Sequence, residues 1–442
     1  MGSMRKQPHL AKSEKKNVDI KDLYAVKISE IWRQLKREHF SFWALCAYFL
    51  FEYVRPQSIY PEIDILPWAQ LFLLLAILGA FMDSSVKLQS NALNKLIITF
   101  FCVVLLSSVF AFRPMIAFSD LKLFAGWLIV YFLIVGILNT RSRYFMFCLF
   151  YLIYSFKMSQ HGFRSWADRG FGFTDWGISG PPGWFHNSGE FAIQMLLFLM
   201  MSGAIVLGIK HYWSKFKSFI FYLMPFTALI SIIGASSRGA QLALFAACIW
   251  LVLRSDKKLV TIFIVLIVIV LAYFFLPDEQ ITRFQNMGND NTSLQRMAYW
   301  DVGFEIWQKY PILGVGYGNW LVYIQHTYPE GIGPLQYHQL SHNIFIQVIA
   351  DLGTVGLLLF LLMIVYILRL NAKSYVIGKK YGDPFIQYCS FGLNLGLVCY
   401  LVAGFFVSVF YYPFFWVQMG LAAALYNNAC IYKTESVGKV GQ

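Results

Sequence analysis

Two arginines have surroundings that suit the binding of an anion. Arg238 lies in a Ser-Ser-Arg-Gly-Ala run at 236–240, between two apolar segments, and Arg296 lies early in a helix expected over residues 292–309. A guanidinium offers a planar fork of donors that fits phosphate oxygens. Arg238 would also lie at a helix start, where free N–H groups and the helix dipole favour anions. Two interpretations of Arg238 remain, a phosphate ligand or an arginine that anchors the helix end at a polar boundary.

Histidine offers a second kind of chemistry. His342 follows the run Tyr-His-Gln-Leu-Ser at 337–341 and begins an apolar segment. Because imidazole titrates near neutral pH, His342 can accept a proton from a hydroxyl or orient it, and a structural histidine is the alternative. His338 lies four residues earlier, so both rings would share one helix face if the helix starts early. A metal site is not expected, because no third ligand follows at suitable spacing.

Further polar residues and glycines are candidates for substrate binding, namely Arg164, Glu190, Gly316, His338, Gln339 and Asn343. Glu190 has a second interpretation, because it falls in the first turn of a helix that Asn187 or Ser188 can cap. Gly316 lies in a glycine-rich turn at 314–318. This turn follows a helix and not a strand, so it does not fit a dinucleotide site, and we expect a tight turn back toward the apolar segments.

The composition determines the class of scaffold that must position these residues. The chain has 442 residues, of which 58% are hydrophobic and 13% charged, whereas soluble chains carry about 25% charged residues. A soluble enzyme of this size would need more polar surface. We therefore expect an all-α polytopic membrane protein in a lipid bilayer. The net charge of +13 does not indicate a nucleic-acid partner, because the positive residues gather in loops between apolar segments.

Twelve apolar segments are candidate membrane spans. They lie at residues 40–55, 66–82, 94–112, 121–139, 143–158, 189–209, 217–235, 238–253, 258–276, 342–369, 384–410 and 413–431. With both termini cytoplasmic, most of the 36 Lys and Arg residues fall on the inner side, as the positive-inside rule requires. The outer side is rich in arginine, at Arg55, Arg113, Arg164, Arg169, Arg238, Arg283 and Arg296.

The expected order of the chain follows from these spans. A tail at 1–39 precedes spans one to nine at 40–276, which include an outer segment near 159–188. A large outer loop at 277–341 precedes spans ten to twelve at 342–431 and a tail at 432–442. In the outer loop, Thr292 or Ser293 is expected to cap the helix, and Asp278, Glu279 and Asp290 are expected in a solvated stretch.

Three motifs in this order resemble the bacterial O-antigen ligase superfamily, which also includes O-antigen polymerases and protein O-oligosaccharyltransferases. They are the Ser-Ser-Arg-Gly-Ala run at 236–240, the Arg296 helix that leads into the glycine-rich turn, and the Ser-His-Asn run at 341–343. The resemblance covers residues 235–365 well. The stretch Glu-Tyr-Val-Arg-Pro-Gln-Ser-Ile-Tyr-Pro at 52–61 is similar to the O-glycosylation ligases linked to exosortase systems.

The resemblance implies a helical glycosyltransferase of the C type in the bacterial inner membrane, with the loop 277–341 in the periplasm. The donor would be a glycan on undecaprenyl diphosphate and the acceptor a sugar hydroxyl of lipid A–core, with no metal or other cofactor. Arg238 and Arg296 would hold the diphosphate, and His342 would act on the acceptor hydroxyl in an inverting transfer. A polymerase or a protein O-oligosaccharyltransferase would use the same donor, and these alternatives stay open. A transporter of lipid-linked glycans is disfavoured, because charges at mid-membrane and internal repeats are not evident.

Overall fold

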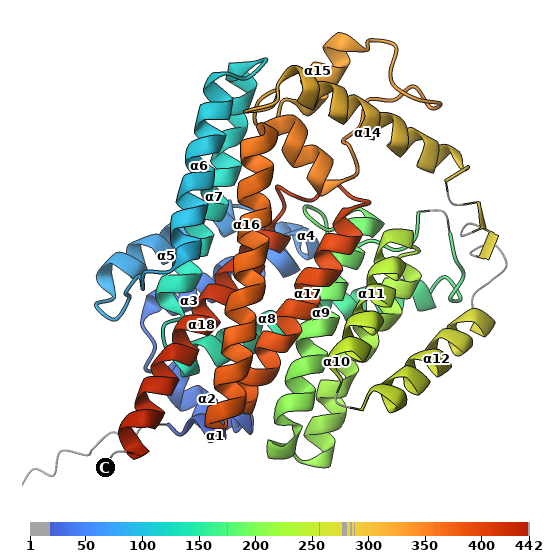
Figure 1. The fold of residues 1–442 in the computed structure, drawn as a ribbon. Coiled ribbons are helices and arrows are strands. Elements are labelled where there is room, and N and C mark those ends of the chain that lie inside the picture. The colour runs from blue at the N-terminus through green and yellow to red at the C-terminus, as the bar shows by residue number, and fades with distance from the viewer. Residues whose placement is uncertain are drawn as a thin grey trace, which may run out of the picture.

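The chain folds into a bundle of helices (Figure 1). The computed structural model describes residues 18–174, 176–255, 257–275, 281–282, 285–286 and 288–440. Within these ranges the chain forms helices and one isolated bridge between Ile332 and Tyr337, and no strand. The predicted all-α class is therefore confirmed.

The first part of the chain supplies the helices up to the centre of the bundle. They are α1 (Ile20–Tyr24), α2 (Ile28–Leu35), α3 (Phe40–Phe49) with the π-helix η1 (Leu50–Val54), α4 (Pro56–Ile59), the 3₁₀ turn η2 (Pro61–Ile63), α5 (Trp68–Met82), α6 (Ala92–Val109), α7 (Pro114–Ile137), α8 (Arg141–Ala167) and α9 (Ser188–Ile209). Helix α9 is apolar on all sides, and nearly all of its side chains are buried, which is typical of a helix at the centre of a bundle.

The second part adds the helices that carry the predicted site. They are the 3₁₀ turn η3 (Lys210–Tyr212), α10 (Lys215–Gly234), α11 (Arg238–Arg254), α12 (Lys258–Phe275), α14 (Asn291–Lys309), α15 (Trp320–Thr327), α16 (Ile344–Tyr381), α17 (Pro384–Gly404) and α18 (Pro413–Val440). Helix α9 packs against α10 and α17, and glycines allow a close approach. A Cβ at Gly392 of α17 would lie 2.8 Å from the carbonyl oxygen of Met200, as small residues often permit in membrane bundles.

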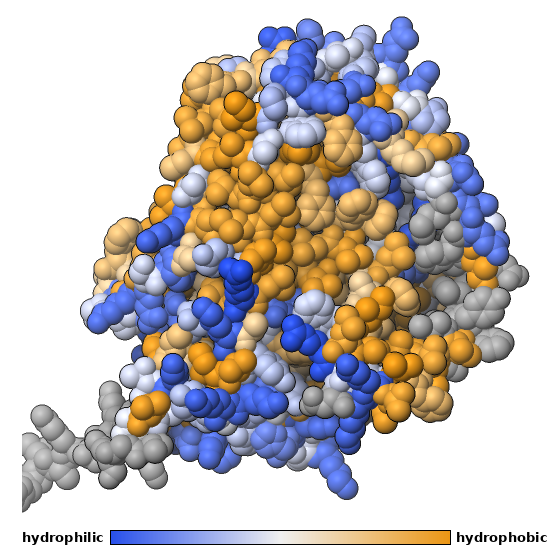
Figure 2. Space-filling model, in the orientation of Figure 1, coloured by the Kyte–Doolittle hydropathy of each residue, from blue (hydrophilic) through white to orange (hydrophobic). Residues whose placement is uncertain are grey.

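Each of the twelve predicted spans contains a helix. Six helices of the described chain are long and apolar enough to cross a membrane, namely Ala92–Val109, Pro114–Ile137, Ser188–Tyr212, Lys215–Gly234, Ile344–Tyr381 and Pro384–Gly404. In Figure 2 an apolar region covers the middle of the visible face, with polar residues above and below it. These features support a membrane protein, while the other six spans stay a prediction.

The two ends of the described chain lie at one end of the bundle. Helices α1 and α2 and the last turns of α18 meet there, whereas α14 and α15 lie at the opposite end (Figure 1). That both tails lie on one side of a membrane and the loop 277–341 on the other stays a prediction. Which of these ends is periplasmic stays a prediction.

Helix α14 belongs to a second, smaller hydrophobic core at its end of the bundle. Tyr299 and Ile306 of α14 pack there with Trp320 of α15 and Ile346 of α16. The glycine-rich turn closes this core, as Val315 N–H donates to Ala350 O at 2.8 Å and Phe112 N–H donates to Val315 O at 2.8 Å. The predicted tight turn is therefore present, and it packs against α6 and α16.

The same turn interlocks with a kink in α16. Gly353 interrupts this helix with a φ of 65° and a ψ of −165°. A Cβ at Gly353 would lie 2.3 Å from Ile312 O, and a Cβ at Gly314 would lie 2.4 Å from the carbonyl carbon of Asp351. Neither contact leaves room for a side chain, and both φ values are in the region that favours glycine.

Candidate functional site

Arg238 forms a two-armed ion pair with Asp290, which comes from the segment before α14. Its Nη1 lies 2.8 Å from Asp290 Oδ2, and its Nη2 lies 3.2 Å from Oδ1. Arg238 is the first residue of α11, at the helix start that the sequence predicted, and Ser237 is the N-cap. The residue before it, Ser236, is held in the left-handed region with a φ of 51°. The turn between α10 and α11 thus directs a guanidinium toward α14.

Asp290 was not expected at this site, and its position corrects two predictions. It is the N-cap of α14, because Ser293 N–H donates to Asp290 Oδ1 at 3.1 Å, so the helix is not capped by Thr292 or Ser293. It is also ion-paired and not free in a solvated stretch: 28% of its side chain is exposed, and the hydrogen bonds from Arg238, followed by those from Ser293, lower its pKa well below the usual range. Asp278 and Glu279 lie outside the described residues.

Arg296 is half-buried in the second turn of α14. Its Nε is buried and has no hydrogen-bond partner within the described chain. Burial, and then the positive charge of Arg238, lower the pKa of Arg296 to about 10, while Asp290 acts in the opposite direction. Arg296 therefore lies within the electrostatic reach of both residues. Two guanidinium groups beside one carboxylate leave a positive charge that favours an anion.

His342 lies next to this pair, before the first residue of α16. Its Nε2 is 3.1 Å from Gln339 Oε1, and in the neutral tautomer that donates to this oxygen the acceptor is Nδ1. Burial, and then the charge of Arg296, lower the pKa of His342 to about 4. The imidazole is therefore neutral at neutral pH. Burial is the larger of these two causes.

Two polar residues near His342 in the chain, Asn343 and His338, form hydrogen bonds to backbone groups. Asn343 caps α16 by accepting from Phe345 N–H at 2.8 Å and Ile346 N–H at 3.2 Å. His338 contacts Tyr328 O through Nε2 at 2.6 Å. Because α16 begins at Ile344, the helix does not start early enough for the two histidines to share one of its faces. His342 itself has a φ of 50°, which is uncommon for a residue other than glycine.

The other candidates are not brought to this cluster by any described contact. Glu190 forms the capping box of α9 with Asn187 and accepts from Tyr412 Oη at 2.8 Å, in agreement with its capping interpretation. A Cβ at Gly316 would lie 2.2 Å from Ala111 Cβ, so the glycine is needed for packing on the turn that follows α6. Arg164 is exposed on α8, and its Nε contacts Gln160 O at 3.4 Å.

The remaining outer arginines have separate environments. Arg169 Nη1 donates to Gly177 O at 2.9 Å, and the guanidinium of Arg113 lies over the ring of Phe112 at 5.1 Å. Arg283 lies outside the described residues. Arg55 lines a cavity of about 450 Å³ together with Glu52 and Trp68. No site was predicted in this region, although the stretch 52–61 resembles the O-glycosylation ligases linked to exosortase systems.

The fold and the cluster together define a helical membrane protein with a positively charged site, beside a neutral histidine, at one end of its bundle. Residues 223–361 match the family model described as O-antigen ligase. This segment runs from α10 into α16 and contains Arg238, Asp290, Arg296 and His342. Over this segment the match confirms the resemblance to the O-antigen ligase superfamily that the sequence showed. No curated protein matched the chain.

Proposed function

We propose that this protein is an O-antigen ligase that transfers a glycan from undecaprenyl diphosphate to a sugar hydroxyl of lipid A–core. The family match supports an enzyme of the ligase or polymerase type in general. The observation that carries the finer proposal is the position of Arg238, Arg296 and His342. The two guanidinium groups suit a diphosphate, and the neutral imidazole beside them suits the activation of a hydroxyl.

In the proposed reaction, a hydroxyl oxygen of the acceptor forms a bond to the anomeric carbon of the donor. The bond from that carbon to the diphosphate oxygen breaks, and its electron pair leaves with the diphosphate. Attack from the opposite face inverts the anomeric configuration. The hydroxyl proton passes to Nδ1 of His342, the ring nitrogen that does not face Gln339.

Arg238 and Arg296 would stabilise the negative charge that grows on the leaving diphosphate. The loss of one such donor typically costs about 10²–10³ in rate, and the loss of a general base about 10²–10⁴. Asp290 holds Arg238 at two atoms, so the guanidinium is oriented before the donor binds. The diphosphate is an activated leaving group, so the transfer needs no redox cofactor or nucleotide.

Reconstitution of the purified protein in vesicles with a lipid-linked glycan tests this proposal. Lipid A–core, a second lipid-linked glycan and a pilin-like protein are offered as acceptors in separate reactions. A glycan joined to lipid A–core alone is the expected product. A longer lipid-linked glycan would instead identify a polymerase, and a glycosylated protein would identify a protein O-oligosaccharyltransferase. Arg238→Ala is the matched control for transfer at the proposed site.

The same reconstitution tests whether the reaction depends on a metal. Within the described residues, no group of three or more His, Cys, Asp or Glu residues could hold a metal ion. We expect transfer to continue at an undiminished rate after treatment with EDTA. Loss of transfer on chelation, with recovery on addition of Mg²⁺ or Mn²⁺, would show that the proposed mechanism is incomplete.

A further inference from the structure

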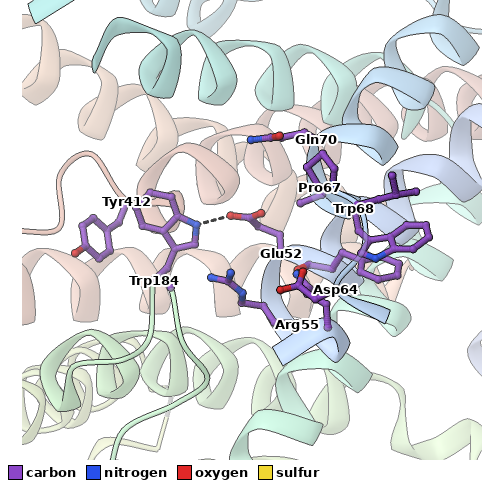
Figure 3. A pocket seen from close by; sticks show the side chains of 13 residues that line it. Glu52, Arg55, Asp64, Pro67, Trp68, Gln70, Trp184 and Tyr412 are labelled. Atoms are coloured by element: carbon purple, nitrogen blue, oxygen red, sulfur yellow. Dashed lines mark hydrogen bonds between the residues drawn. The ribbon is translucent and has the colours of Figure 1, made fainter. Parts of the chain in front are cut away.

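The cavity lined by Arg55 is a pocket that lies where η1 and α4 meet the start of α5. Its volume is about 450 Å³, which is within the range of small-molecule sites. Figure 3 shows Glu52 at its centre, between Trp184 on one side and Trp68 on the other, with Arg55 and Asp64 close by. None of the residues that line it belongs to the cluster around Arg238.

Two tryptophans form fixed walls of this pocket. Trp68 stacks on Phe51, with ring centroids 5.3 Å apart, and its Nε1 donates to Ile63 O at 2.5 Å. Trp184 donates from Nε1 to Glu52 Oε1 and contacts the ring of Tyr412 at 4.9 Å. Because these rings are held by their neighbours, they can offer broad apolar surfaces to a ligand without losing much conformational freedom.

Two polar side chains in the lining have hydrogen-bonding capacity that the protein does not use. Gln57 is only 9% exposed, and its Nε2 donates to Phe51 O at 3.2 Å. This bond fixes the orientation of the amide, because a flip would bring two oxygens together. Gln57 Oε1 and Arg55 Nε are both buried and have no partner among the described residues. Such atoms are rare in native proteins and call for an explanation.

The two unused atoms differ in what they need from a partner. Gln57 Oε1 needs a donor, and Arg55 Nε needs an acceptor. A phosphate has only acceptors at its oxygens when ionised, and an ammonium group has only donors. A hydroxyl is both donor and acceptor, so a ligand with several hydroxyl groups can give each of these atoms the partner that it needs. The carboxyl groups of Glu52 and Asp64 also line the pocket and can accept hydrogen bonds from further hydroxyl groups.

The backbone at Arg55 supports the view that this is a binding site. Arg55 has a φ of 52°, and strained conformations of this kind gather at functional sites. Its Nη1 donates to Pro182 O at 3.0 Å, and a Cβ at Gly183 would lie 1.9 Å from the same nitrogen. The loop before α9 therefore clamps the guanidinium at the edge of the pocket, where only glycine can follow Pro182.

One short connection links this pocket to the arginine cluster. The segment from Phe405 to Tyr412 joins α17 to α18. At its start, Phe405 contacts Trp300 of α14 at 5.1 Å between ring centroids, and a Cβ at Gly239 would lie 3.0 Å from Phe406 Cβ. At its end, Tyr412 lines the pocket. Seven residue steps span at most roughly 25 Å, so one extended glycan could reach both sites.

We propose that the pocket binds a neutral pyranose unit of a glycan. The sugar ring would lie against Trp68 and Trp184, and its hydroxyl groups would pair with Arg55, Gln57 and the two carboxyl groups. The two carboxyl groups beside one guanidinium distinguish this pocket from the arginine cluster, because they disfavour a phosphate. The proposal rests on the proposed function only for the identity of the glycan, which belongs either to the acceptor or to the donor.

Calorimetric titration of the purified full-length protein in detergent tests this proposal with three probes. The probes are the core oligosaccharide released from lipid A, the repeat-unit oligosaccharide released from the donor, and inorganic diphosphate. We expect at least one oligosaccharide to bind to the native protein. Binding of the core identifies a subsite for the acceptor, and binding of the repeat unit identifies a subsite for the donor glycan.

Variants then locate the binding. Trp68→Ala should weaken binding of the oligosaccharide by at least about tenfold, as expected for an aromatic anchor of a binding site. It should leave diphosphate binding unchanged. Gln70→Ala, at an exposed residue of the lining, gives a second reading if Trp68→Ala does not fold. Trp32→Ala on α2, whose side chain is 56% exposed, is the matched control and should bind like the native protein.

Two results would overturn the proposal, namely no binding of either oligosaccharide to the native protein, or unchanged binding in both pocket variants. Failure of the proposed function has a different signature. A protein that binds an oligosaccharide in the pocket but transfers no glycan to any acceptor would refute the ligase and leave the pocket intact. Glycan transfer by a native protein that binds neither oligosaccharide would refute the pocket alone.

Discussion

Arg238 and Arg296 differ in their partners, and this difference bears on what each can contribute. Arg238 is held by Asp290 at two atoms, whereas Arg296 Nε has no partner in the described structure. Replacement of either residue by alanine should lower turnover by about 10²–10³ without loss of folded protein. Lysine should restore only part of the rate, because a point charge does not reproduce the fork of donors.

Turnover of monodisperse protein at saturating acceptor measures this effect. Arg33→Ala, at an arginine of α2 whose side chain is 49% exposed, serves as a control and should transfer like the native protein. Native rates in both alanine variants at the cluster would exclude a role for these arginines in the transfer.

The surroundings of His342 determine the pH below which transfer should fall. A base must be unprotonated, and burial together with Arg296 lowers the pKa of His342 to about 4. Transfer should therefore remain steady from neutral pH down to about pH 5 and fall as the pH drops through 4, well below the ordinary histidine value of about 6.5. His342→Gln should transfer slowly and lose this inflection, while its diphosphate affinity stays normal.

Protonation of His342 should also change the free energy of unfolding, but over a different range of pH. Between pH 6.5 and about 4 the unfolded chain binds a proton at His342 that the folded chain does not, so this residue lowers the stability progressively as the pH falls through that window. A pH–rate profile that bends near 6.5 would mean that the imidazole is solvated during the reaction and that burial does not control it.

The sequence indicated three residues of the cluster but not the fourth. Arg238, Arg296 and His342 stand out because charged residues beside apolar segments are costly without a purpose. Asp290 lies 52 residues from Arg238 along the chain, and only the folded loop brings them together. A local signal existed, since aspartate three residues before Ser293 is a common N-cap. This N-cap signal was missed because the stretch around Asp290 was interpreted as solvated.

Helix α14 is connected to the arginine cluster through its N-cap, so Asp290 has two separable roles. Asparagine is as good an N-cap as aspartate but carries no charge. Asp290→Asn should therefore preserve α14 and remove the competitor for Arg238, which should tighten diphosphate binding by about fivefold, equivalent to about 1 kcal/mol for a partly exposed pair.

Titration with inorganic diphosphate and thermal unfolding separate the two roles. Asp290→Ala should in addition lower the stability by about 1 kcal/mol through loss of the cap. Asp301→Asn, at an exposed carboxylate of the same helix, controls for the change in net charge. Weaker diphosphate binding in Asp290→Asn would show that Asp290 orients Arg238 for the ligand more than it competes with it.

Hydropathy predicted where the helices lie but not how they bend. Each predicted span contains a helix, because long apolar runs have few other ways to satisfy their backbone in a bilayer. The kink at Gly353 was not predicted, because it depends on the fit of Gly353 against the distant residue Ile312. The π-helix η1 was not predicted either. Helix α15, which packs in the small second core, was hidden in a loop of mixed composition.

The predicted topology of the molecule in the membrane can be tested by cysteine labelling. Helix α15 and the last turns of α18 lie at opposite ends of the bundle (Figure 1). Glu330, which follows α15, and Lys433, near the end of α18, are both exposed. A thiol reagent that does not cross membranes should label Glu330→Cys from outside intact cells and Lys433→Cys only after the membrane is opened. The unaltered protein, with its seven cysteines, gives the background. Labelling of both positions from outside would contradict the predicted topology.

The interlock between the glycine-rich turn and the kink of α16 limits how this end of the molecule can move. The turn continues the chain from α14, which carries Arg296, and the kinked segment of α16 follows directly after His342. Since Gly314 and Gly353 each fit against the backbone of the other segment, the two elements share one set of rigid-body degrees of freedom. Arg238 belongs to α11, outside that unit. We therefore expect the backbone segments that carry Arg296 and His342 to move as one unit, and adjustment to ligands of different size to occur at the boundary that the Arg238–Asp290 pair spans.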